Sequence, residues 1–128
     1  MQSLAHQAYG QVQKRTSSDK DIEVAIIQQI TRELENAADA EDPPITQLVD
    51  AVSRNLQMWT IFAADVANPK NTVADEGKAS LISISGFVHR ESMKLMGSTG
   101  EIVDLLEVNR NLLASMGKSL PARAKKAM

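Results

Sequence analysis

Few side chains in this chain of 128 residues have the type and spacing needed for catalysis or metal binding. The chain has no cysteine, which excludes disulfides, thiolate metal ligands and a cysteine nucleophile. Its two histidines, His6 and His89, have no nucleophile or metal-ligand spacing linked to either. His89 and Glu91 are two positions apart, so on a helix they face different directions. We therefore predict that the protein is not an enzyme and has no catalytic residues, no metal and no cofactor.

The glycine-containing sequence GSTG, residues 97–100, has the composition of a phosphate-binding loop but not its context. It lacks the lysine and the preceding strand that such a loop requires. We interpret it as a turn between two helices, with a glycine cap.

Charge and hydropathy disfavour two broad classes of partner, nucleic acid and the membrane interior. The net charge is −2 and aromatic residues make up 3% of the chain, which does not favour nucleic-acid binding. No apolar run at the N-terminus resembles a signal peptide, and no stretch approaches the ~20 apolar residues of a membrane span. We expect a cytoplasmic protein with no membrane insertion and no direct contact with nucleic acid.

The elements that must position any functional side chain all read as helices. Hydroxyl residues stand three positions before an acid at Ser18, Thr72 and Ser98, the pattern of a capping box. Pro43 and Pro44 suit a helical first turn, and Gly97 and Gly117 suit left-handed C-terminal caps. The chain is thus predicted to be all-α: a single-domain antiparallel bundle of about four main helices plus a short N-terminal helical segment. The predicted ranges are 3–14 for the short segment and 19–37, 44–66, 73–96 and 101–116 for the main helices.

Apolar residues recur at helical spacing and define the expected core. The first main helix carries such a series from Ile22 through Ile26 and Ile30 to Leu34, and the second is predicted to bury Trp59. Asn109 falls within the apolar stripe of the last helix, so we predict that it bonds a facing helix and fixes register. Asn55, one turn before Trp59, is expected to do likewise.

Some bulky apolar residues lie outside these core stripes. Met58 and Phe62 leave the stripe of the second helix, and Phe87 and Met93 leave that of the third. We predict that these four side chains border a groove that binds a partner helix; alternatively, the segment 3–14 covers them. Residues 1–117 are expected to form the helical domain, and residues 118–128 a basic, flexible tail.

At this level of detail the chain resembles the FlaF family of flagellar biosynthesis proteins. Residues 51–69 carry Asn55, Trp59, Phe62 and Asp65 in the order and spacing of the family core N-x-x-L-W-x-x-F/L-x-x-D, followed by a proline turn. Residues 81–88 (LISISGFV) are similar to the family's next segment. Residues 105–112 (LLEVNRNL), with Asn109, are similar to its terminal L-I-x-I-N-x-x-I motif. The resemblance extends from about Ala8 to Gly117.

The resemblance implies a cytoplasmic helper of flagellum assembly in alphaproteobacteria. It implies flagellin as the partner and a role in flagellin synthesis and export, as a chaperone acting opposite the flagellin-mRNA repressor FlbT. Two alternatives stay open: an adaptor that contacts FlbT or an export component without holding flagellin, and a regulator that contacts RNA through the basic tail.

Overall fold

The described residues form four α-helices and no strand. The computed structural model describes the backbone of residues 4–121 and the side chains of residues 20–121. The helices are α1 (Leu4–Asp39), α2 (Ile45–Ala67), α3 (Asp75–Met96) and α4 (Ile102–Ser115). The prediction of an all-α bundle is confirmed.

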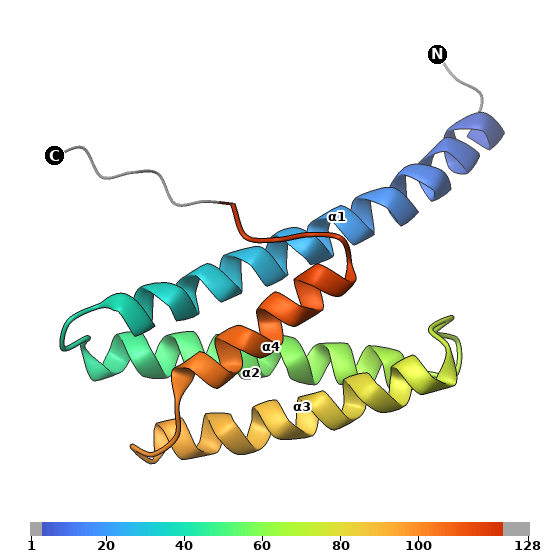
Figure 1. Cartoon of the computed structure of the whole chain (residues 1–128). Coiled ribbons are helices and arrows are strands. Elements are labelled where there is room, and N and C mark those ends of the chain that lie inside the picture. The colour runs from blue at the N-terminus through green and yellow to red at the C-terminus, as the bar shows by residue number, and fades with distance from the viewer. Residues whose placement is uncertain (1–3, 122–128) are drawn as a thin grey trace, which may run out of the picture.

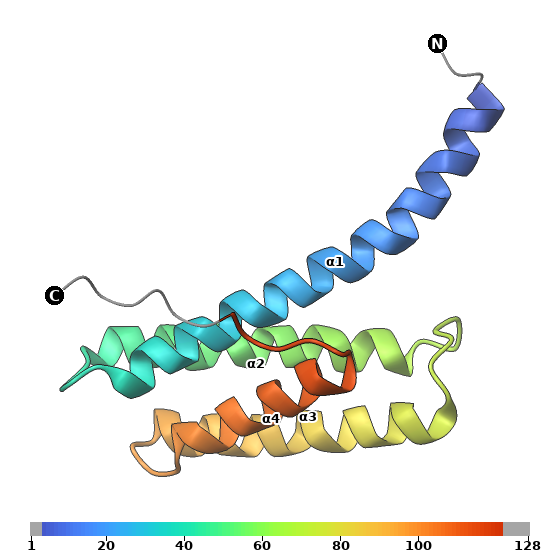
Figure 2. The ribbon, with the colours of Figure 1, turned by 45° about the horizontal axis from the view of Figure 1, so that its top comes forward.

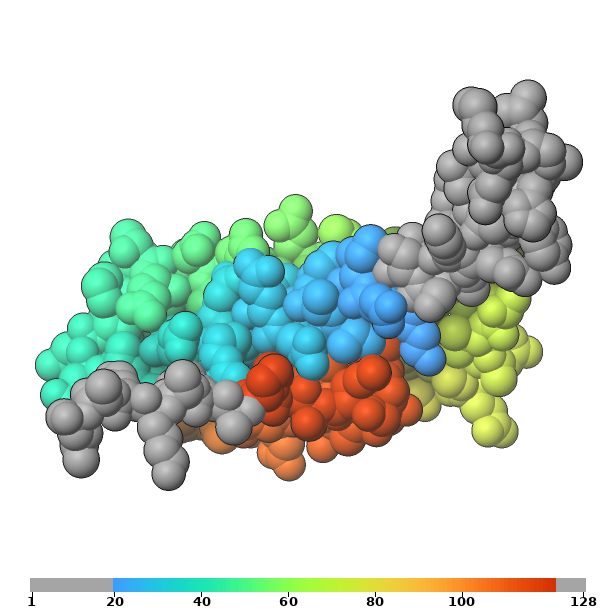
Figure 3. All heavy atoms as spheres, turned by 90° about the horizontal axis from the view of Figure 1, so that it is seen from above, coloured from blue at the N-terminus to red at the C-terminus, as the bar shows by residue number. Residues whose placement is uncertain are grey.

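Each helix packs mainly against its neighbours in an antiparallel ring. α1 packs against α2 and α4, and α3 packs against α2 and α4, whereas α2 and α4 have no close backbone approach to each other. α4 crosses over α2 and lies between α1 and α3 (Figure 1). The side chains of α1 and α4 lie side by side on the face seen in Figure 3. The groove described below is lined by residues of all four helices.

The N-terminal part of the chain differs from the prediction. The separate segment 3–14 and the helix start at Ser18 are both wrong, because α1 runs without a break from Leu4 to Asp39. No proline occurs before Pro43, and serine and aspartate cost a helix only about 0.5 kcal/mol each, too little to end it. The first part of α1 projects beyond the bundle instead of lying over α2 and α3 (Figures 1 and 2).

The predicted caps at the ends of α3 and at the start of α4 are also corrected. α3 begins after Ala74 and α4 after Glu101, and neither has a side-chain cap, so the capping boxes at Thr72 and Ser98 are wrong. Gly97 has a φ of −90° and is not left-handed. Ser98, with a φ of 66°, takes that position. A residue in this conformation ends α3 and cannot also be the extended N-cap of α4.

Gly117 behaves as predicted at the end of α4. Its φ is 70°, and the N–H of Lys118 donates to the carbonyl of Leu113 at 2.8 Å, which closes the last turn. Beyond it, the backbone crosses α1: Gln28 Nε2 donates to the carbonyl of Ser119 at 2.9 Å, and Arg32 donates to that of Pro121. Residues 122–128 lie outside the described residues, so the flexible basic tail stays a prediction.

The core confirms the burial of Trp59, which is 1% exposed, and corrects the predicted stripe of α1. Ile22 and Ile26 are exposed, while Val24 and Ile27 are buried in their place. A helix repeats every 3.6 residues, so a series at every fourth residue drifts by about 40° per step and leaves a fixed face. Ile22 therefore cannot share a face with Leu34.

Candidate functional site

Four polar side chains meet inside the core, where α1, α2 and α4 face one another. Trp59 Nε1 donates a hydrogen bond to Asn109 Oδ1 at 2.8 Å. The Asn109 amide nitrogen donates to Asn55 Oδ1 at 2.8 Å and to Thr31 Oγ1 at 3.0 Å. All four residues are 1% exposed or less. The prediction that Asn109 and Asn55 bond facing helices is confirmed.

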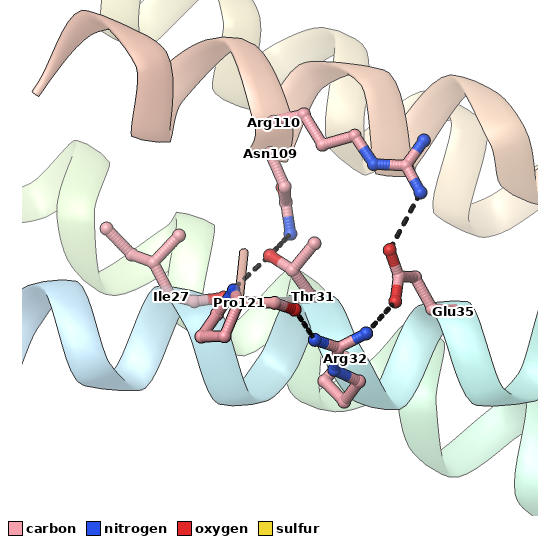
Figure 4. A network of polar contacts seen from close by, with 7 residues as sticks. All are labelled: Ile27, Thr31, Arg32, Glu35, Asn109, Arg110 and Pro121. Atoms are coloured by element: carbon pink, nitrogen blue, oxygen red, sulfur yellow. Dashed lines mark hydrogen bonds and ion pairs between the residues drawn. The ribbon is translucent and has the colours of Figure 1, made fainter. Parts of the chain in front are cut away.

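Thr31 connects this cluster to the backbone of α1. Its hydroxyl donates to the carbonyl of Ile27 at 2.6 Å, so the oxygen that accepts from Asn109 is held by its own helix (Figure 4). Asn109 thus uses both amide hydrogens and its oxygen, while Asn55 Nδ2 and Ser92 Oγ lack a partner among the described residues. Such a network fixes the register of α4, because a shift of α4 along its axis would leave buried polar groups without hydrogen-bond partners.

A second set of polar contacts lies at the surface beside this buried cluster. Glu35 of α1 bonds Arg32 at 2.6 Å and Arg110 of α4 at 2.8 Å, and Arg32 also reaches Pro121 (Figure 4). The two arginines are partly exposed. We assign these contacts a structural role, joining α1, α4 and the C-terminal segment.

Asp65, the other predicted motif residue, shapes the loop after α2. Its carboxylate accepts a hydrogen bond from Asn71 Nδ2 at 3.2 Å, and its carbonyl accepts one from the N–H of Asn68 at 3.1 Å. Asn71 Oδ1 in turn accepts from the N–H of Val73 at 2.9 Å. These bonds orient the turn that leads into α3.

An apolar groove of about 720 Å³ lies on the described part of the molecule, and all four helices contribute to it. We call it the four-helix groove. Its floor contains the buried residues Trp59 and Val66. The remaining lining residues are Glu23, Asp65, Asn71, Val73, Gly77, Ser80, Leu81, Ile84, Val108, Asn111, Leu112, Ser115 and Met116.

The walls of the groove expose apolar surface that the bundle does not cover. Leu81 and Ile84 of α3 and Leu112 of α4 are only half-buried, although each packs against the core. The groove exists because α4 is shorter than α3 and the backbones of these two helices approach each other less than those of α2 and α3 do. A smaller hollow of about 50 Å³, bordered by Phe62 and Met116, adjoins it at Glu23 and Asp65.

Two carboxylates supply the formal charge of the groove lining within the part of the chain whose side chains are described. Glu23 lies on α1 and Asp65 on α2. Burial, and next the charge of Asp65, raise the pKa of Glu23, while Lys20 opposes the shift. The surroundings of Glu23 therefore disfavour its ionised form.

The four predicted partner-binding residues do not lie along one groove. Met58 is 5% exposed and belongs to the core, with one edge on a separate hollow of about 210 Å³ between α1 and α2. Phe62 lies between that hollow and the small one beside Glu23, and its ring meets the indole of Trp59 edge to face, with centroids 6.4 Å apart. Phe87 is half-buried and Met93 exposed on α3, and neither lines a hollow described above. Their role in partner binding stays a prediction.

Sequence reasoning missed the groove because its walls come from surfaces that are distant in the chain. A usable signal was present in α3, where Gly77 and Ser80 precede Leu81 and Ile84. Small residues beside large apolar ones allow a second helix to approach closely, and here α4 does not fill that space.

Among the residues whose side chains are described, no group of three or more His, Asp or Glu residues could hold a metal ion. No helix of the described chain is both long and apolar enough to cross a membrane. The lining of the groove combines apolar side chains with hydroxyl, amide and carboxylate groups.

Fold and groove together define a small helical protein that offers an apolar surface hollow between its helices. The chain belongs to the FlaF family: the family model described as flagellar protein FlaF matches residues 5–116, nearly the whole chain. The resemblance inferred from the Trp59 and Asn109 motifs is thus confirmed, and the chain is a flagellar protein. No curated protein and no solved structure matches it in the corresponding comparisons.

Proposed function

We propose that this flagellar protein binds flagellin in the cytoplasm and supports its synthesis and export, holding an amphipathic helix of flagellin in the four-helix groove. The observation that carries the proposal is the groove itself, an apolar hollow of about 720 Å³ on a member of the FlaF family.

The groove has the chemistry that an amphipathic helix requires. Leu81, Ile84 and Leu112 offer apolar contacts along both walls, and serine and asparagine side chains at its edge remain in water. Burying each large apolar side chain of a partner contributes roughly 1.5–3 kcal/mol. Three such side chains contribute roughly 4.5–9 kcal/mol, which is comparable to the lower estimates of the cost of association and is consistent with a reversible complex, as a protein destined for export needs.

Capture of purified flagellin by the immobilised protein tests the proposal. The variant Val73→Ser with Met116→Ser removes apolar surface from both rims of the groove. Because Val73 is 39% exposed and Met116 follows the end of α4, we expect helicity to be kept and flagellin affinity to fall about tenfold, or 1.4 kcal/mol.

The matched control is Ile82→Ser with Val103→Ser. These residues lie on α3 and α4, are 45% and 53% exposed, and do not line the groove. The control is expected to bind flagellin as the wild type does. Equal losses in both variants, or no capture by the wild type, would contradict the proposal; capture of FlbT without flagellin would favour the adaptor function instead.

A further inference from the structure

We propose that the four-helix groove selects a helix that carries a lysine or arginine at the edge of its apolar face, and that Glu23 and Asp65 bind this cation. The inference rests on the proposed function, because it specifies the partner of the same groove. It adds a specificity determinant that the apolar walls alone do not supply.

The charge of the groove has one sign. Among the described residues that line it, Glu23 and Asp65 are the charged ones, and neither an arginine nor a lysine accompanies them. They come from different helices, yet both border the groove and also the small hollow that adjoins it. The two carboxylates therefore lie close to each other beside the groove, and the charge of Asp65 acts on Glu23.

Among the residues whose side chains are described, neither carboxylate forms an ion pair. In residues 20–121, where side chains are described, the ion pairs involve Glu33, Glu35 and Glu91 but neither Glu23 nor Asp65. Asp65 accepts one hydrogen bond from Asn71, which orients its carboxylate without supplying a charge. The charge of Asp65 disfavours the ionised form of Glu23, and the exposed Lys20 offsets this only in part.

A cation between the two groups would remove this repulsion. A helix that fills the apolar part of the groove excludes water from its end, so an uncharged partner would leave two carboxylates poorly solvated. A partner with a lysine or arginine at that position would instead gain charge-assisted hydrogen bonds. The groove thus favours basic amphipathic helices and disfavours acidic ones.

The test compares two variants that change the net charge equally. Glu23→Gln with Asp65→Asn removes the groove carboxylates, while Asp50→Asn with Glu107→Gln removes two exposed acids on α2 and α4 outside the groove. The probe is purified flagellin. We expect the groove variant to bind about tenfold more weakly at low salt and the control to bind within about twofold of the wild type.

Salt dependence and charge exchange provide independent readouts. Raising the ionic strength from about 0.05 M to about 0.5 M should weaken wild-type binding and have much less effect on the groove variant. A flagellin variant in which one lysine or arginine becomes glutamate should lose binding to the wild type and regain it with Glu23→Lys and Asp65→Lys. Circular dichroism and Tm check folding, and the single variants Glu23→Gln and Asp65→Asn should each show part of the loss.

The outcomes separate the two proposals. If the wild type and the groove variant capture flagellin equally, with the same salt dependence, the charge selection is wrong while flagellin binding stands. Equal losses in the groove variant and the control show a general charge effect and also overturn the inference. No capture by the wild type overturns both proposals.

Discussion

Replacement of Asn109 by alanine tests whether the buried polar cluster holds α4 in place. The substitution leaves two buried groups without partners: the N–H of Trp59 and the side-chain oxygen of Asn55. Thr31 keeps its bond to the carbonyl of Ile27. An unpaired buried polar group costs about 1–3 kcal/mol, so we expect Asn109→Ala to lower the free energy of unfolding by about 3 kcal/mol.

Urea unfolding followed by circular dichroism measures this change, and Asn111→Ala is the matched control. Asn111 lies two positions further along α4 and is exposed, so its replacement should change the free energy of unfolding by less than about 0.5 kcal/mol. A free energy of unfolding of about 5–15 kcal/mol is ordinary for a domain, so the loss at Asn109 is large enough to measure.

A double-mutant cycle isolates the bond between Trp59 and Asn109. Trp59→Phe keeps an aromatic ring but removes the N–H donor, and it should cost about 1–2 kcal/mol in the wild type beyond its change in packing. In the Asn109→Ala background the donor is already unpaired, so its removal should cost much less. An equal cost in both backgrounds, or an Asn109→Ala variant as stable as the wild type, would refute the reasoning.

Three further predictions concern stability and use the same unfolding measurement. Trp59→Ala should cost about 3–5 kcal/mol because the indole is fully buried, and a loss below about 1 kcal/mol would show that it is not a core residue. Glu23→Gln should raise Tm at neutral pH. The pKa of Glu23 in the folded protein lies above its ordinary value of 4.5. The wild type therefore becomes less stable relative to this variant as the pH rises from 4.5 through the raised pKa. A constant Tm difference from pH 4 to pH 7 would contradict this assignment. Ile61→Ser, at a position 59% exposed, should change the free energy of unfolding by less than about 1 kcal/mol, whereas Met58→Ser should cost more than about 2 kcal/mol because Met58 belongs to the core.

The sequence predicted the features that depend on strong local signals. Pro44 and Pro69 bracket α2, whose predicted and observed ends differ by one residue, because proline cannot continue a helix from its interior. Gly117 ends α4 in the left-handed conformation that glycine adopts most easily. The burial of Asn109 followed from its position between apolar residues at helical spacing.

The features that were missed depend on weak or distant signals. Ser18 stands three residues before an acid, as the first residue of a capping box does. It would cap a helix only if a helix began there, and α1 instead continues through it. Met58 was placed outside the core because α2 was assumed to bury one stripe, whereas α2 is covered by α1 on one side and by α3 on another. The four-helix groove combines residues from Glu23 to Met116, and no local pattern records that α4 leaves the space beside α3 open.

Trp59 connects the polar cluster to the groove. Its ring forms part of the groove floor, and its N–H donates to Asn109 of α4, whose neighbours Val108 and Leu112 line the opposite wall. Because the backbones of α2 and α4 do not approach each other closely, side chains such as Trp59 must span the distance between them. A smaller residue at position 59 would let α4 settle toward α2 and narrow the groove, and loss of Asn109 would free α4 to shift along it. Trp59 and Asn109, 50 positions apart in the chain, thus both act on the separation between the groove floor and the α4 wall. Any helix that binds in the groove must fit the width that this pair sets.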